Sequence, residues 1–441
     1  MRGAIAAGHP LTAQAGARVL EEGGNAVDAC IAAAFAAFVT EGPLTGPAGG
    51  GFFLAHVEGE ATLLDCFFSV PSEPLGEIEH LTVDFGSTTQ SYHVGEGSIA
   101  VPGLLAGLSD AHDRFGQLSW QELVAPAIEL ARAGVAVSEA QAFLHEILVA
   151  VLQRDEGGRR IYANARHLDT SDLVATLERI GADPVAAVCE LLPELASDLD
   201  VYRPVERELL RTTIDGREVL TTPTPSRGGA IVAAALTGFG ASSSLDGRAR
   251  ALRDAYGSAS VGGIAGTTHI SVIDAAGNAA GLSSTLGAGS GVHRGGTQLN
   301  NMLGEFDVIG RGELVPGERL ASMMTPTLVL EDGRPRLALG SAGSVRLAGA
   351  IAQVAAAVIG GAAVGAAITA PRFHVVGERE LHLEGGWPAA AAEELPPGDW
   401  EVIPWQSLNL YFGGVSAVEL RSDGSLDAAG DPRRGGHGIV V

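Results

Sequence analysis

Short apolar segments separated by glycine-containing turns most strongly limit what this chain can fold into. Thr268–Asp274 and Ala279–Thr285 flank the turn Ala275–Asn278, and a second pair of apolar segments flanks Glu331–Gly333. A third pair flanks Glu58–Glu60. Apolar runs of this length, rich in β-branched residues and bounded by turn residues, predict β-hairpins. The sequence pattern therefore predicts a central series of hairpins.

Helical patterns lie on both sides of this hairpin series. Residues 11–22 have helical spacing, and the apolar stretch Ala29–Val39 indicates a buried helix that Asn25 caps, with Asp28 in its first turn. Helices at both ends of a hairpin series favour two sheets packed between helical layers. Further helices are predicted within 102–135, 171–180, 184–192 and 347–359.

Composition indicates a globular protein and excludes several functions. The 441 residues can bury a large core, as one large domain or two to three smaller ones. A hydrophobic content of 46%, a charged content of 18% and 61 glycines are typical of a compact, turn-rich chain. The net charge of −24 without a basic patch argues against nucleic-acid binding. All 28 basic residues are arginine, which excludes lysine-dependent phosphate loops, Schiff bases and Ser–Lys dyads.

Cysteine use and hydropathy predict a cytoplasmic protein. The three cysteines, Cys30, Cys66 and Cys189, are odd in number and widely spaced, which argues against a disulfide framework. The N-terminal residues lack the apolar run of a signal peptide, and Ala29–Val39 is too short to span a bilayer. The histidines lack metal-ligand spacing, so we expect no metal, no cofactor and no membrane partner.

One strand start carries a pattern of catalytic interest, Gly266-Thr267-Thr268-His269. A threonine hydroxyl is a weak nucleophile without a base. Cleavage of the Gly266–Thr267 bond would free an α-amine with a pKa near 8 on the same residue, and Gly266 would tolerate the distorted backbone that cleavage needs. Taken alone, the motif favours an ordinary strand start, since threonine is common in strands. His269 is expected to be structural.

The pattern resembles the processing site of the gamma-glutamyltransferase (gamma-glutamyltranspeptidase, glutathione hydrolase) family of N-terminal-nucleophile hydrolases, whose small subunit opens with Thr-Thr-His. Several long blocks match the family's landmarks in one order, and the match is weakest between about 140 and 260. The ordered series favours the catalytic interpretation. The matching blocks are His9–Leu11, Gly23–Ala29, Gly49–Phe52, Val101–Gly103, Asn300–Asn301, Ser322–Thr327, Gly340–Arg346 and Asp431–Gly435.

The resemblance implies an α+β fold, a four-layer αββα sandwich with a helical lobe. Residues 1–266 would be the large-subunit segment, with the lobe and part of the sandwich. Residues 267–441 would be the small-subunit segment, beginning at the nucleophile. The two fragments would stay together after self-cleavage.

The resemblance also implies the catalytic residues. Thr267 would be nucleophile and base, and the hydroxyl of Thr285 would support it. Gly343 and Ser344 would donate backbone N–H groups to the oxyanion, and a serine in the second position is tolerated because only its amide is used. The implied activity is transfer of a gamma-glutamyl or related small acyl group from a small-molecule amide to water or an amine.

The substrate-holding residues depart from the family's pattern. Phe67 stands at about the place of the arginine that binds the substrate α-carboxylate, and Gly287 replaces an asparagine. Glu305 stands for an aspartate that binds the substrate amine. This loss of polarity favours a less polar acyl group. The residues expected to contact substrate are Glu305, Ser322, Phe67, Asn301 and Met302, with Met323 replacing a second serine.

Three interpretations stay open at this point. A gamma-glutamyl hydrolase or transferase follows the family's usual activity, and an amidase for another small acyl group follows the altered substrate residues. A catalytically silent homologue, acting as a binding or scaffold protein, is the alternative from a different class. Arg227 or Arg294 would supply a substitute cation for a substrate carboxylate if either lay at the site.

Overall fold

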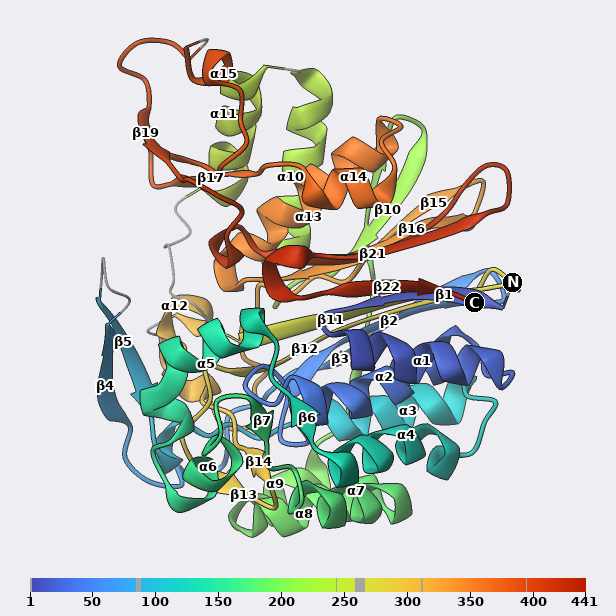
Figure 1. Cartoon of the computed structure of the whole chain (residues 1–441), viewed down its shortest axis with the longest axis vertical. Coiled ribbons are helices and arrows are strands. Elements are labelled where there is room, and N and C mark those ends of the chain that lie inside the picture. The colour runs from blue at the N-terminus through green and yellow to red at the C-terminus, as the bar shows by residue number, and fades with distance from the viewer. Residues whose placement is uncertain (1, 85–88, 243, 258–265, 311, 394) are drawn as a thin grey trace.

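The fold is α+β and is built on two antiparallel sheets (Figure 1). The computed structural model describes residues 2–84, 89–242, 244–257, 266–310, 312–393 and 395–441. Within this part of the chain, none of the helices combines the length and apolar character that a membrane span requires.

The larger sheet has seven strands and contains the predicted Thr268 hairpin at its centre. Every residue of the two hairpin strands is buried, because both faces of this sheet are covered. In spatial order the strands are β22 (His437–Val440), β1 (Gly3–Ala7), β11 (Gly266–Asp274), β12 (Ala279–Gly287), β2 (Gly50–Val57), β3 (Glu60–Cys66) and β8 (Val205–Arg207).

The second sheet has six strands and packs face to face on the first, through contacts of β11 with β16 and β20. Its middle strands carry the predicted Glu331–Gly333 hairpin. In spatial order they are β21 (Leu426–Gly430), β20 (Gly414–Leu420), β16 (Arg334–Ala342), β15 (Thr327–Glu331), β10 (Arg217–Thr221) and β9 (Leu210–Ile214).

Helices α1 (Pro10–Glu21) and α2 (Ala26–Thr40) cover the outer face of the seven-stranded sheet (Figure 1). The predicted cap of α2 is confirmed, since the side chains and backbones of Asn25 and Asp28 form a capping box. All of α2 is buried between β11 and β12 on one side and α4 on the other. Helix α3 (Leu104–Phe115) packs beside α2 on β2 and β3. Further out lie α4 (Trp120–Ala133), α7 (Leu173–Ala182), α8 (Pro184–Leu191) and α9 (Ala196–Val201).

A second group of helices covers the outer face of the six-stranded sheet (Figure 1). Helix α13 packs on β16 and β20 and has the predicted bounds, Leu347–Ile359. Its neighbours are α10 (Gly228–Ala241), α11 (Leu245–Tyr256) and α14 (Val364–Thr369), followed by the small sheet β17 (Phe373–Val376), β18 (Glu380–Leu383) and β19 (Glu401–Pro404).

Several further elements lie at the side of the sheets where β11 begins (Figure 1). They are β4 (Glu79–Asp84), β5 (Thr89–Val94), α5 (Glu139–Leu152), α6 (Glu156–Ile161) and α12 (Phe306–Ile309). Both chain termini lie at the opposite side.

The predicted opening order, helix first, is wrong because strand β1 precedes α1. Gly3–Ala7 pairs with β11 on one side and with β22 on the other, and all five residues are buried. A short apolar run without alternation carries no strand period, so local pattern could not identify it. The helical pattern of 102–135 belongs to two helices, and Ser119 caps the second.

Segments before and after Gly266 are interleaved in both sheets. In the larger sheet, β1 lies between β22 and β11, and β12 lies against β2. In the smaller sheet, β10 pairs with β15. Each sheet is therefore complete only with strands from both segments.

Candidate active site

A small pocket lies at the N-terminal end of β11. It brings together every predicted site residue except Gly343 and Asn301. Its lining comes from β11, β12, the loops around α12 and the start of α13. The lining residues are Phe67, Thr267, Thr285, Gly287, Met302, Glu305, Val308, Ser322, Met323, Met324, Ser344 and Leu347.

Thr267 lies at an irregularity in the β11–β12 pairing. Gly266 is opposite Gly287 and Thr268 is opposite Ser284, so the register shifts at Thr267. Such bulges redirect a side chain, and Thr267, which is 3% exposed, lines the pocket. A Cβ on Gly266 would lie 2.6 Å from the carbonyl oxygen of Gly287. Close approach of the neighbouring strand is thus the observed reason for glycine at 266.

The hydroxyl of Thr285 touches the bond that precedes Thr267. Its Oγ1 donates a hydrogen bond to the carbonyl oxygen of Gly266 and accepts one from the N–H of Gly287 at 2.8 Å. In the uncut chain, Thr285 therefore polarises the Gly266 carbonyl, and its implied support of Thr267 stays a prediction.

The turn Gly343–Ser344 presents two backbone N–H groups beside the pocket. Gly343 has a φ of 134° and Ser344 a φ of 56°, a left-handed conformation that is unusual for serine. Among the described residues, neither N–H group has a hydrogen-bond acceptor. Ser344 lines the pocket and Gly343 directly precedes it. Such free N–H groups can bind a developing oxyanion.

Glu305 supplies the carboxyl group of the pocket. Its Oε1 accepts a hydrogen bond from the N–H of Ala288 at 2.9 Å. Burial raises the pKa of Glu305 to about 7, although the Ala288 N–H acts in the opposite direction. Near neutral pH the side chain can therefore be either an acid or an acceptor for a substrate amine.

The remaining wall of the pocket is largely apolar. The ring of Phe67 stacks on that of Phe52 with centroids 5.6 Å apart, and Phe67 is 1% exposed. The hydroxyl oxygen of Ser322 accepts a hydrogen bond from the nearby N–H of Met324 at 3.1 Å. The sequence did not single out two lining residues, Val308 and Leu347.

Asn301 is not among the residues that line the pocket, but its side chain lies beside it, since a Cβ on the lining residue Gly287 would lie 2.2 Å from its Oδ1. Its Oδ1 accepts a hydrogen bond from the N–H of Gly289 at 3.0 Å, and its Nδ2 donates to the carbonyl of His93 at 3.1 Å. The side chain therefore holds the loop after β12 against β5. Asn300 similarly joins loops, through the N–H of Ala100 at 2.9 Å.

Neither candidate arginine supplies a cation to the pocket. Arg294 forms ion pairs with Glu194 at 2.8 Å and Glu96 at 3.3 Å. Arg227 donates a hydrogen bond to the carbonyl of the lining residue Val308 at 3.3 Å but does not itself line the pocket. Among the described residues, no arginine lines this pocket.

A second small cavity is also lined by Thr267. Glu41 and Arg434 line it, and Oε2 of Glu41 accepts a hydrogen bond from Oγ1 of Thr268 at 2.6 Å. Burial raises the pKa of Glu41. The sequence analysis did not assign either residue to the site. The available signal for Glu41 was a single acidic residue directly after an apolar helix.

His269 is structural, as the sequence indicated. Its two ring nitrogens lie 2.8 Å from the hydroxyls of Ser283 and Ser271, and burial lowers its pKa to about 3. In the part of the chain that the structure describes, no three His, Cys, Asp or Glu side chains gather as metal ligands.

Comparison with known proteins identifies the fold and the family of the chain. The fold matches the crystal structure of cephalosporin acylase from Bacillus halodurans with a TM-score of 0.82, over 99% of this chain and 95% of that chain, at 20% identity. The sequence profile described as Gamma-glutamyltranspeptidase matches residues 12–189 and 243–441. The chain therefore belongs to the gamma-glutamyltranspeptidase family.

Relatives with two kinds of name resemble the chain almost equally. The acylase ACY 1 proenzyme of Pseudomonas sp. (strain V22) is 28% identical, over 100% of this chain and 94% of the relative. The glutathione hydrolase proenzyme of Pseudomonas aeruginosa is 29% identical over the same shares. Both are named as enzymes and as proenzymes.

Proposed function

We propose that this chain is a self-processing amidase that transfers an acyl group from an amide to water or to an amine, through an ester on Thr267. The observation that carries the proposal is the contact of the Thr285 hydroxyl with the carbonyl of the Gly266–Thr267 bond, beside a pocket that Thr267 lines. The proenzyme names of the relatives support it. No observation favours a silent homologue.

Maturation would proceed by an acyl shift within the uncut chain. The hydroxyl oxygen of Thr267 attacks the carbonyl carbon of Gly266, and the carbonyl oxygen takes negative charge beside the Thr285 hydroxyl. The C–N bond then breaks, and the nitrogen of Thr267 takes up the hydroxyl proton. Water hydrolyses the resulting ester, which leaves Thr267 with a free α-amine.

Turnover would use that amine as the base, since its usual pKa lies near 8. The amine accepts the proton of the Thr267 hydroxyl as the oxygen attacks the substrate amide, and returns it to the leaving amine. The N–H groups of Gly343 and Ser344 would hold the oxyanion, each contributing roughly 3–4 kcal/mol to the transition state. Glu305 would accept a hydrogen bond from a substrate amine.

The substrate class we propose is a small amide whose acyl group is less polar than gamma-glutamyl. The apolar wall around Phe67 supports this, as does the lack of an arginine among the described lining residues. A buried carboxylate without a cation costs several kcal/mol. The relatives are named as an acylase and a glutathione hydrolase, and these names are compatible with a gamma-glutamyl group as well as with a less polar acyl group.

We also propose that the two sheets and their covering helices form the four-layer αββα sandwich of N-terminal-nucleophile hydrolases, with the outer helices α3–α9 as the helical lobe. Residues 1–266 and 267–441 would be its two fragments after cleavage. A cytoplasmic location stays a prediction.

Self-cleavage can be tested on the purified protein. A denaturing gel should resolve two fragments, and sequencing of the smaller one, residues 267–441, should begin at Thr267. Thr267→Ala should remain one folded chain, because alanine has no hydroxyl to attack Gly266. Efficient cleavage of Thr267→Ala at this bond would remove Thr267 from the mechanism.

A further inference from the structure

The oxyanion turn rests on the backbone of Gly413. A Cβ on Gly343 would lie 2.9 Å from the Cα of Gly413, and a Cβ on Gly413 would lie 3.0 Å from the carbonyl oxygen of Ala342. Gly413 also has a φ of 82°. The strands leading to the turn and to Gly413 are paired, with Ala342 opposite Gly414. A shift of Gly413 would therefore move the turn.

The side chain that holds Gly413 is Arg372. Its Nη1 donates to the carbonyls of Phe412 at 3.1 Å and Gly413 at 3.2 Å. Its Nη2 donates to Oδ2 of Asp431 at 2.6 Å and to the carbonyl of Ile368 at 3.0 Å. Arg372 is 2% exposed, so water cannot replace these contacts.

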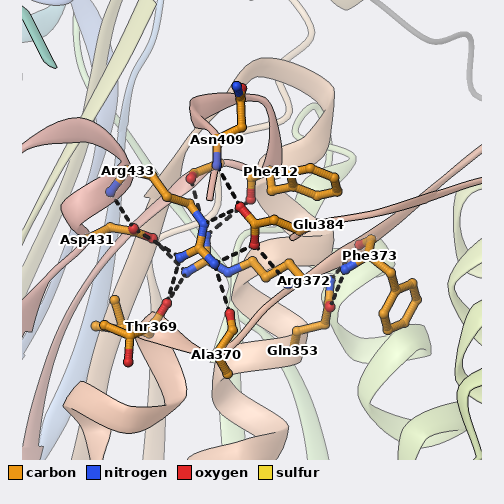
Figure 2. A network of polar contacts seen from close by, with 12 residues as sticks. Gln353, Thr369, Ala370, Arg372, Phe373, Glu384, Asn409, Phe412, Asp431 and Arg433 are labelled. Carbon is orange, nitrogen blue, oxygen red and sulfur yellow. Dashed lines mark hydrogen bonds and ion pairs between the residues drawn. The ribbon is translucent and has the colours of Figure 1, made fainter. Parts of the chain in front are cut away.

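Arg372 belongs to a buried network of two arginines and two carboxylates (Figure 2). Arg433 pairs with Asp431 at 3.1 Å and donates its Nε to Glu384 at 2.7 Å. Burial alone would raise the pKa of Asp431, but the two guanidinium groups hold it below its usual value. The network is charge-balanced, as buried ions require.

The same two carboxylates hold the backbone on both sides of Gly413. Glu384 accepts a hydrogen bond from the N–H of Asn409 at 2.8 Å. Asp431 accepts one from the N–H of Val415 at 3.0 Å. Residues 409–415 are thus fixed at each end by an acid and in the middle by Arg372.

We propose that Arg372 is a positioning residue for the oxyanion donors, which it sets through the backbone of Gly413. It touches no lining residue of the substrate pocket, so its effect on the reaction passes through the turn at 343–344. Displacements of about 1 Å at such donors lower reaction rates strongly. The inference rests on the proposed function, since it requires that these N–H groups bind the oxyanion.

The test compares Arg372→Lys with Arg433→Lys in the cleaved enzyme. Lysine keeps the charge but loses the guanidinium fork, so one ammonium cannot serve Asp431 and two backbone carbonyls together. Arg433 is the matched control, because it lies in the same network and bonds neither Phe412 nor Gly413.

Arg372→Lys should lower kcat by roughly 10- to 100-fold, with KM within about twofold, as expected for loss of an interaction made only in the transition state. Arg433→Lys should lose comparable stability and keep kcat within about threefold. Self-cleavage of Arg372→Lys should stay close to the wild-type rate, because Thr285 contacts the Gly266 carbonyl in the uncut chain.

A second readout separates positioning from general damage. An alkyl boronate forms a tetrahedral adduct with a threonine hydroxyl, so its inhibition constant should rise with the loss in kcat for Arg372→Lys. The constant for the carboxylic acid product should not change. If Arg372→Lys does not fold, Gly413→Ala, which crowds Ala342 directly, should give the same pattern.

Two outcomes would overturn the positioning role. One is an equal loss of kcat in Arg372→Lys and Arg433→Lys. The other is a rise, in Arg372→Lys, of the inhibition constants of both the boronate and the carboxylic acid product. Failure of the proposed function looks different, because the wild-type protein would then show no turnover that depends on Thr267.

Discussion

At the scale of single residues, the carboxyl group of Glu305 should make the stability of the folded chain depend on pH. Its pKa of about 7 lies above the ordinary value of 4.5, chiefly because of burial. Between these two pH values the folded chain binds more protons than the unfolded chain. The free energy of unfolding therefore falls as pH rises from about 4.5 to 7.

Glu305→Gln should remove this contribution. In the uncut Thr267→Ala chain, ionisation of Glu305 should make the free energy of unfolding at pH 8 lower than at pH 5, by at most about 3 kcal/mol. Screening by solvent makes the expected difference smaller than this limit. Urea unfolding at several pH values measures the difference. Glu146→Gln, on the exposed side of α5, is the control. An unchanged pH slope in Glu305→Gln would contradict the assignment.

The prediction on substrate choice depends on Phe67. A gamma-glutamyl anilide should have a kcat/KM on the order of 10²-fold below that of an anilide with an uncharged acyl group of similar length, because its α-carboxylate meets Phe67 without a cation. Phe67→Arg should narrow this gap. A gamma-glutamyl compound that reacts about tenfold faster, a gap of roughly 1.4 kcal/mol, would favour the plain gamma-glutamyltransferase reading.

At the scale of elements, the pairing of β11 with β12 places the proposed cleavage site. The register shift at Thr267 and the donor on Thr285 come from two strands of one hairpin. Thr285→Val keeps the branched shape and removes the donor to Gly266. Self-cleavage should then slow on the order of 10²-fold or more, by loss of an oxyanion donor, as followed by fragment appearance on gels.

Two variants check this interpretation. Thr285→Ser retains a hydroxyl and should recover much of the rate. Ser284→Ala changes the opposite face of β12, where Ser284 lies 2.8 Å from the hydroxyl of Thr45, and should leave cleavage unaffected. Equal rates for Thr285→Val and wild type would show that the Gly266 carbonyl needs no such donor.

Element prediction succeeded where the signal was local. The capping box of Asn25 and Asp28, the hairpin turns and the bounds of α13 follow from residues a few positions apart. Strand β1 was missed, because Gly3–Ala7 becomes a strand only through pairing with β11 and β22. Its short apolar run is compatible with either a strand or a helix.

At the scale of the whole molecule, interleaved strands should keep the fragments together. Cleavage before Thr267 leaves β1 between β22 and β11, with its backbone hydrogen bonds intact. The mass by light scattering should therefore match that of uncut Thr267→Ala, whose chain mass is 44.9 kDa or a multiple of it. The fragments should separate only in denaturant. Their separation on gel filtration without denaturant would contradict this strand order.

The sequence by itself determined much of the local structure and the family of the chain. Turn residues and apolar spacing specified hairpins and helices because these depend on neighbours along the chain. The ordered motifs around Thr267 and Gly343 pointed to the family, which the profile match confirms. Those motifs named Thr285, Ser344 and Glu305, all of which line one pocket.

Only the tertiary structure decided what each of these groups touches. Thr285 meets the carbonyl of Gly266, Asn301 holds a loop beside the pocket, and Glu41 bonds the hydroxyl of Thr268. The buried network of Arg372 was equally invisible, since its partners lie up to 59 positions away. Contacts between distant segments depend on packing and register, which no short stretch of sequence specifies.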